Sequence, residues 1–182
     1  MKVVDPAEVL TFWFAPGRAE QWYAEDANFD ADIRRRFLAT YEAACSRQLD
    51  EWLETPHSLL ALIIVLDQLP RNMFRGSARA FATDAQAVAL TKHGIEKGFD
   101  RSFTGAELDF FTMPLMHSES LGDQALLLAM GYGDNRYARD IMKPSRASAA
   151  SPIATRYSAA KTPPKRTPIS PRAKQDNNGR AR

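Results

Sequence analysis

Residues 55–72 read TPHSLLALIIVLDQLPRN, and this stretch decides the fold. Thr55 can cap a helix with its hydroxyl, and Pro56 suits the first helical position, where the backbone N–H needs no partner. The apolar run from Leu59 to Leu66 is too short to cross a bilayer, so it predicts a helix buried in a core. Pro70 ends that helix. The stretch therefore predicts a core helix that leads into a polar segment.

Other segments carry similar helix signals. Asp5 and Pro6 predict the start of a first helix, and a second is expected from about Asp30 to Ser46. A helix from 84 to about 97 would stop at Gly98. Three capping boxes are predicted, at residues 83–86, 104–107 and 120–123. No segment alternates as a strand does, so we predict an all-α chain of roughly six antiparallel helices.

The charge changes abruptly along the chain. Residues 141–182 hold ten Lys or Arg and one acidic residue, and six of the eleven prolines. Residues 1–140 hold 14 basic and 21 acidic residues, a net charge of −7. We predict a helical domain over 1–140 and a disordered basic tail over 141–182.

The single cysteine, Cys45, excludes an internal disulfide and favours a cytoplasmic protein. Its helical apolar surroundings favour a small buried side chain over a reactive thiol. No signal peptide or membrane partner is predicted. A solvated helix face explains Arg34–Arg36 better than a nucleic-acid site does, so no specific nucleic acid is expected.

The first polar stretch follows the core helix directly. Asp67 and Gln68 come at its end, so at least one of them is expected to be buried. Arg71 and Arg75, four positions apart, would share a face if a turn of helix continued past the proline, and they could grip a carboxylate or phosphate. The alternative, which we weigh more heavily, is that they pair with Asp67 and Asp84 and hold two helices together. The predicted binding residues here are Asp67, Gln68, Arg71, Asn72 and Arg75.

The second polar stretch contains His117, Glu119 and Asp123. An imidazole with two carboxylates suits an acid–base pair or a metal. No second histidine stands at ligand spacing, so no metal is predicted. The alternative is that the carboxylates favour the positive end of a helix while His117 bonds a neighbour. His117 and Glu119 complete the predicted binding set.

Other functional motifs are absent from the sequence. It contains no phosphate-binding glycine loop, nucleophile elbow, zinc spacing or dinucleotide fingerprint. We therefore predict no cofactor and assign no catalytic residue, and the sequence leaves open whether the protein is an enzyme.

Several multi-residue motifs give the chain a strong family resemblance. They are residues 9–14 (VLTFWF), 49–52 (LDEW), 66–72 (LDQLPRN), 81–84 (FATD) and 114–119 (PLMHSE). In order and spacing, over about residues 7–140, they resemble the bacterial domain of unknown function 924. This resemblance implies an all-α fold similar to tetratricopeptide arrays, and it implies no known reaction.

The family pattern continues with a segment FGRFPHRNAILGR, where residues 148–160 of this chain read SAASPIATRYSAA. A second reading frame takes the last base of each codon of this chain together with the first two bases of the following codon. Starting from the last base of the Ala147 codon, this frame can encode the entire family segment. The same regrouping of residues 161–170 permits KNTPEEDAYL. We interpret the basic tail as an out-of-frame product of one lost base between about Arg139 and Ala147. The rival interpretation is a disordered arm that binds nucleic acid.

Two functions remain open from the sequence. The protein either binds a small anionic ligand in a polar pocket between helices, or it is a helical-array module that binds a protein partner without catalysis. A closed polar pocket with converging Arg and His would favour the first function, and a large apolar or charged groove would favour the second.

Overall fold

The computed structural model describes residues 2–131, and it contains helices and no strands over that range. The α-helices are α1 (Pro6–Trp13), α2 (Ala27–Cys45), α3 (Pro56–Asp67), α4 (Leu69–Met73), α5 (Asp84–Glu96), α6 (Ala106–His117) and α7 (Leu121–Ala129). Short 3-10 helices are η1 (Arg18–Glu20), η2 (Asp50–Leu53), η3 (Ala78–Phe81) and η4 (Phe99–Ser102). The all-α prediction is confirmed, and the predicted tail, 141–182, lies outside the described residues.

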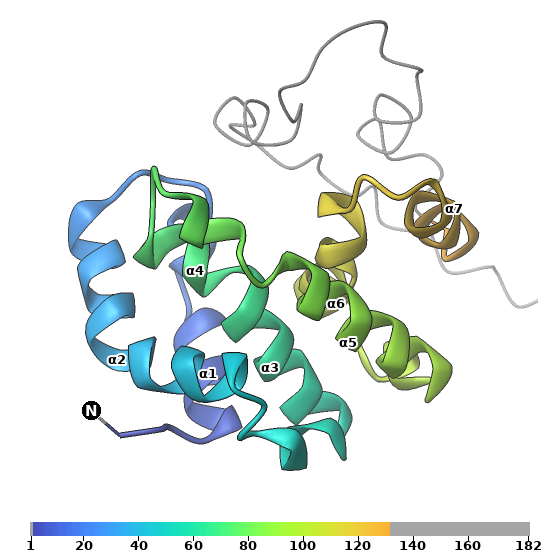
Figure 1. Ribbon diagram of the computed structural model, residues 1–182, viewed down its shortest axis with the longest axis horizontal. Coiled ribbons are helices and arrows are strands. Elements are labelled where there is room, and N and C mark those ends of the chain that lie inside the picture. The colour runs from blue at the N-terminus through green and yellow to red at the C-terminus, as the bar shows by residue number, and fades with distance from the viewer. Residues whose placement is uncertain (1, 132–182) are drawn as a thin grey trace, which may run out of the picture.

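Helix α3 is the centre of the fold. Every residue from Leu59 to Asp67 is buried, and α3 packs against α1, α2, α5 and α6. Figure 1 shows α3 between α1 and α2 on one side and α5 and α6 on the other. Burial of each large apolar side chain stabilises the fold by about 1.5–3 kcal/mol. This helix therefore organises the packing of the elements around it.

Two predicted helix starts are confirmed by their caps. The Asp5 carboxylate accepts from the N–H of Glu8, and the Thr55 hydroxyl accepts from the N–H of Ser58. Helix α2 begins earlier than predicted, because Asp26 rather than Asp30 caps it. The two prolines after these caps lie in the first turns of α1 and α3, as expected.

The three predicted capping boxes are wrong. The Thr83 hydroxyl donates to the carbonyl oxygen of Leu66 at 2.5 Å instead of capping α5. Gly105, not Thr104, precedes α6, and the side chain of Ser120 forms no capping bond to α7. Because α5 packs against α3, the Thr83 hydroxyl bonds to α3 and does not cap its own helix. Pro70 also differs from expectation, since it lies in the first turn of α4 while α3 already ends at Asp67.

A close approach joins α5 to the central helix. A Cβ atom added at Gly94 would lie 2.6 Å from the Phe111 ring and 2.7 Å from the Leu59 side chain. Only glycine permits this separation of α5 from α3 and α6. A smaller apolar cluster around Leu115 and Leu127 then attaches α7 to α6.

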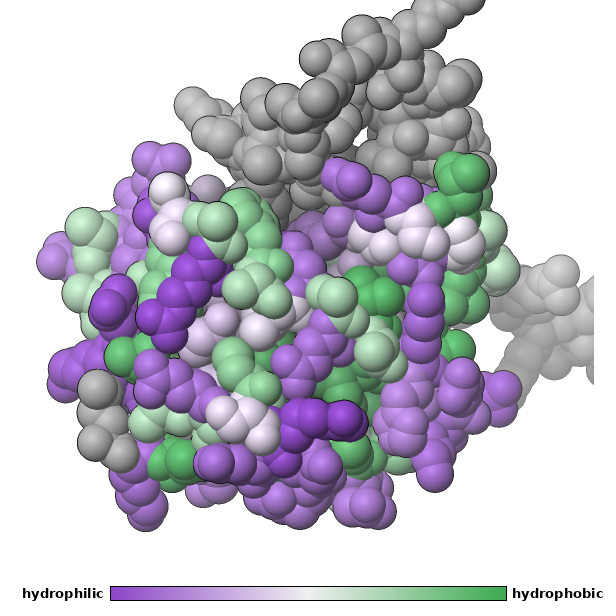
Figure 2. Space-filling model, in the orientation of Figure 1, coloured by the Kyte–Doolittle hydropathy of each residue, from purple (hydrophilic) through white to green (hydrophobic). Residues whose placement is uncertain are grey.

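The surface mixes polar and apolar side chains. Figure 2 shows hydrophilic residues around smaller apolar patches on one face of the molecule. Cys45 is exposed, which corrects the prediction of a buried thiol. Within residues 2–131, no helix has the length and apolar content needed to span a bilayer.

Candidate functional site

The first polar stretch folds into a corner where four helices meet. Asp67 is the last residue of α3, and Gln68 joins α3 to the short helix α4. Arg71 lies in α4, Asp84 begins α5 and His117 ends α6. We call these five residues the Asp67 cluster. Residues 67 and 117, far apart in sequence, are brought together because α3 and α6 pack side by side.

Arg71 is the hub of the Asp67 cluster. Its Nη1 and Nη2 atoms donate to the two carboxylate oxygens of Asp84, each at 3.0 Å. Nη1 also lies 3.3 Å from Asp67 Oδ1 and donates to the backbone oxygen of Asp67. One guanidinium therefore serves two carboxylates, one of them fully buried and the other at the surface side.

His117 completes the inner side of the cluster. Its Nδ1 atom lies 2.8 Å from Asp67 Oδ1 and 2.9 Å from Arg71 Nη2. A guanidinium only donates and an ionised carboxylate only accepts. Nδ1 therefore donates to Asp67 when it carries a proton and accepts from Arg71 when it does not. The amide of Gln68 donates to the second Asp67 oxygen and to the sulfur of Met113.

The pKa values of the two carboxylates are shifted in opposite directions. Burial raises the pKa of Asp67, but the charges of Arg71 and His117 outweigh burial and lower that pKa to about 2. Burial also raises the pKa of Asp84; there the opposing effect of Arg71 does not prevail, and the charge of Asp67 adds to the rise. The Asp67 cluster as a whole thus stabilises the ionised form of Asp67 more effectively than that of Asp84.

Arg75 and Asn72 belong to a different group, the Asp30 cluster. Arg75 donates to both carboxylate oxygens of Asp30, at 2.7 and 3.0 Å, and Asn72 donates to one of them at 2.8 Å. The predicted shared face of Arg71 and Arg75 is therefore wrong, as is the pairing of Arg75 with Asp84. The physical reason is that α4 ends at Met73, so Arg75 falls outside the helix and turns towards α2.

Comparison with known proteins places the chain in a family. A family model described as "Bacterial protein of unknown function (DUF924)" matches residues 9–158. The chain belongs to the DUF924 family. A solved relative, titled "Structure of Protein of Unknown Function ATU0120 from Agrobacterium tumefaciens", is 35% identical with a TM-score of 0.67. The match covers 75% of this chain and 79% of that one. None of the curated proteins compared matches the chain.

The second polar stretch of this DUF924 protein does not gather as predicted. Only His117 joins the Asp67 cluster, whereas Glu119 is exposed in the loop between α6 and α7. Asp123 is buried, accepts from the Ser118 hydroxyl at 2.6 Å and pairs with Lys92 of α5. Among residues 2–131, no group of three or more His, Cys, Asp or Glu side chains could hold a metal ion.

Two residues of the clusters were missing from the predicted set. The sequence identifies Asp84 only as an ion-pair partner, because its position after Thr83 indicates a capping box. It identifies Asp30 only as the start of a helix. The signal that could have found both is their charge, since the buried Arg71 and the nearby Arg75 each need a carboxylate partner.

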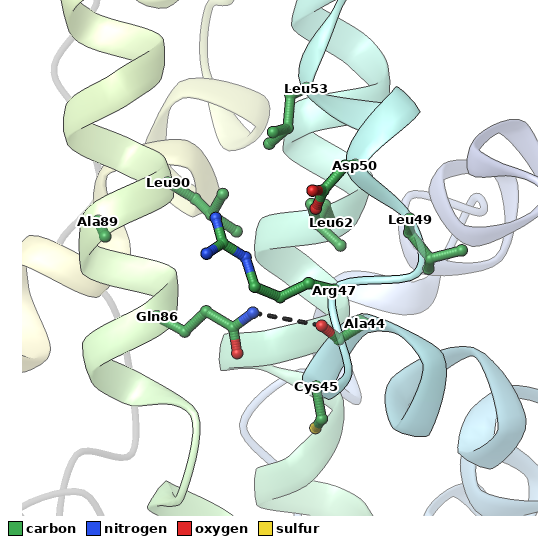
Figure 3. Close-up of a pocket in the computed structure, with 10 residues that line it drawn as sticks. All are labelled: Ala44, Cys45, Arg47, Leu49, Asp50, Leu53, Leu62, Gln86, Ala89 and Leu90. Atoms are coloured by element: carbon green, nitrogen blue, oxygen red, sulfur yellow. Dashed lines mark hydrogen bonds between the residues drawn. The ribbon is translucent and has the colours of Figure 1, made fainter.

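A hollow of about 320 Å³ lies away from both clusters. It is formed by the end of α2, the residues through η2, Leu62 in the middle of α3 and one side of α5 (Figure 3). None of the predicted binding residues lines it.

Proposed function

We propose that the protein binds a small ligand carrying a carboxylate at Arg71, in the place now taken by Asp84. The observation that carries this proposal is the geometry of Asp84 on the guanidinium. Its two 3.0 Å hydrogen bonds demonstrate that a carboxylate fits the outer side of Arg71, and its side chain is still 28% exposed.

The two carboxylates on Arg71 differ in how readily they can be replaced. Asp67 is fully buried and is held by Gln68 and His117 as well as by Arg71. Asp84 is nearer the surface, and its raised pKa means that the site holds its charged form poorly. A ligand carboxylate that displaced Asp84 would keep Arg71 neutralised while Asp84 moved into water.

An aromatic side chain adds a second contact. The Arg71 guanidinium lies 5.5 Å from the ring centre of Phe81, and Phe81 is 39% exposed. A large exposed apolar residue beside a buried cation suits a ligand with an apolar part next to its carboxylate. The full chain carries a net charge of +2, so its overall charge neither strongly attracts nor strongly repels such a ligand, and the contacts at Arg71 must supply the affinity.

The test is a gain of binding on removal of the competing carboxylate. In the full chain, Asp84→Asn should bind acetate or benzoate about tenfold more tightly than the wild type, measured as a ligand-dependent rise in Tm. Glu25→Gln removes the same charge at an exposed position and serves as the matched control. If Asp84→Asn gains no more than Glu25→Gln, or gains only for inorganic phosphate, the proposed ligand class is wrong.

A second candidate function is a helical-array module, similar to tetratricopeptide arrays, that binds a protein partner. The observation that favours it is the compensation of Arg71 by two carboxylates within the chain. In this case the Asp67 cluster only holds helices together. If this second function is correct, Asp84→Asn should lower the stability of the protein and should not increase its affinity for carboxylates.

We also propose that the reading frame of this copy is broken, so that the domain covers 1–140 and the basic tail of 141–182 is out of frame. The support is the codon regrouping, which permits the family segment at every position from 148 to 160 when the third base of each codon is chosen freely. The matched family range runs to residue 158, so the end of the match does not mark the break. The restored segment would bring a histidine and further arginines to the protein.

DNA sequencing across codons 136–150 tests the broken frame directly. One additional base would restore the family segment, and ligand assays should then use that version as well. If the DNA reads as given and codons 148–160 still encode the family segment one frame away, the base was lost from the gene itself. If those codons do not encode the family segment in that frame, the frameshift proposal is wrong.

A further inference from the structure

The hollow beside α2 has an apolar floor and a charged rim. Ala44, Leu49 and Leu62 are buried at its base, and Leu53 and Leu90 are half-buried at its sides. Its volume of about 320 Å³ lies at the lower end of the range for small-molecule sites, roughly 300–1,000 Å³. The hollow can therefore hold a compact apolar group.

Arg47 lies over this hollow in a strained backbone conformation. Its φ of +55° is the one positive φ of a non-glycine residue within residues 2–131. The N–H of Arg47 donates to the Ala44 oxygen and that of Gln48 to the Ala43 oxygen, the Schellman pattern at the end of α2. Glycine suits this position, because its lack of a Cβ permits a positive φ without strain. The arginine side chain is thus present at a conformational cost, as often occurs at functional sites.

The rim offers opposite charges that are not used within the described part of the chain. Arg47 and Asp50 both line the hollow, and neither forms an ion pair in residues 2–131. Figure 3 shows the Arg47 side chain reaching across towards α5, between Gln86 and Leu90, while Asp50 lies on the η2 side near Leu62. A ligand that lies between them meets a cation on one side and an anion on the other.

We propose that this hollow binds a free α-amino acid with an apolar side chain. The ligand carboxylate pairs with Arg47, its ammonium group pairs with Asp50, and its side chain packs on the leucines of the floor. A simple carboxylate would be repelled by Asp50, and a simple amine would be repelled by Arg47, so the two charges together select a zwitterion.

Cys45 supplies a reporter for the test. It is the only cysteine of the chain, it is exposed, and it lines the hollow. In the full chain, millimolar L-phenylalanine should slow the reaction of this thiol with a disulfide reagent several-fold. Phenylpropionate lacks the ammonium group and phenethylamine lacks the carboxylate, so each should protect about tenfold less well at equal concentration. Equal protection by all three compounds, or by none, would overturn the proposal.

Two variants assign the charges and exclude a folding artefact. Arg47→Gly relieves the positive-φ strain, so it should melt at the same or a higher temperature than the wild type while losing protection by L-phenylalanine. Asp50→Asn should bring L-phenylalanine and phenylpropionate to similar affinity. Full binding by Arg47→Gly, or an unchanged preference in Asp50→Asn, would contradict the assigned roles. Asp84→Asn should leave this binding unchanged, which keeps the result independent of the Arg71 proposal.

Discussion

Arg71 and Arg75 stand four positions apart, yet they meet opposite conditions. The Arg71 side chain is 5% exposed and lies against the fully buried Asp67. The Arg75 side chain is 37% exposed and pairs with the partly exposed Asp30. A buried ion that loses its partner costs several kcal/mol, whereas an exposed pair contributes little. Burial, not the presence of an ion pair, therefore decides which arginine the fold depends on.

Loss of Arg71 is expected to have the largest effect. Arg71→Ala leaves Asp67 buried without its main counter-charge, so the free energy of unfolding should fall by about 3–5 kcal/mol. Urea unfolding of the full chain, followed by circular dichroism, measures this change. Arg71→Met serves as a control that keeps more of the side-chain volume but removes the charge, and it should be nearly as damaging. A loss below about 1 kcal/mol in both variants would mean that the pair behaves like a surface pair.

Lowering the pH should change the free energy of unfolding in opposite directions through the two carboxylates of the Asp67 cluster. Asp67 has its pKa lowered from 3.8 to about 2, so its contribution is present above about pH 4 and is lost as the pH falls towards 2. The stability advantage of the wild type over Asp67→Asn should shrink by about 2 kcal/mol over that interval. Urea unfolding at stepped pH measures the difference between the two proteins.

Asp84 should act in the opposite direction. Its pKa is raised in the fold, so the folded state takes up a proton before the unfolded state does, and stability from this group rises as the pH falls through its folded pKa. Asp84→Asn should remove this rise. If the free energies of unfolding of wild type and Asp84→Asn keep a constant difference across the acid range, the fold does not raise the pKa of Asp84.

The Asp30 cluster should show the smallest effect. Arg75→Ala is expected to lower the free energy of unfolding by about 1 kcal/mol or less, because the pair is partly exposed. High salt should reduce this difference further, whereas it should change the effect of Arg71→Ala much less. A loss for Arg75→Ala that equals the loss for Arg71→Ala would erase the distinction between the two arginines.

The fold was predictable from the sequence because its signals are local. The apolar run of α3 and the caps Asp5 and Thr55 act within a few residues, so periodicity and capping rules identify those helices. The failed capping boxes have a tertiary cause. The Thr83 hydroxyl bonds Leu66 on α3, a contact that no neighbouring residue reveals.

Only the part of the candidate site that depends on local sequence was predictable. Burial of Asp67 and Gln68 follows from the apolar helix before them, and the sequence indicated it. The separation of Arg75 from Arg71 depends on the end of α4 at Met73, which the spacing alone did not reveal. The hollow beside α2 has no signal in the sequence, because Arg47 occupies the position after the helix where a glycine would have indicated the turn.

Calorimetry on two variants, each of which removes the carboxylate partner of one arginine, tests the carboxylate site at Arg71. Asp84→Asn releases the outer side of Arg71, and Asp30→Asn releases Arg75. Benzoate titrated into each full-length variant should bind Asp84→Asn about tenfold more tightly than the wild type and should bind Asp30→Asn no better than the wild type. Equal affinity in the two variants, or no gain in Asp84→Asn, would contradict a carboxylate site at Arg71 and leave the Asp67 cluster as a connection between helices.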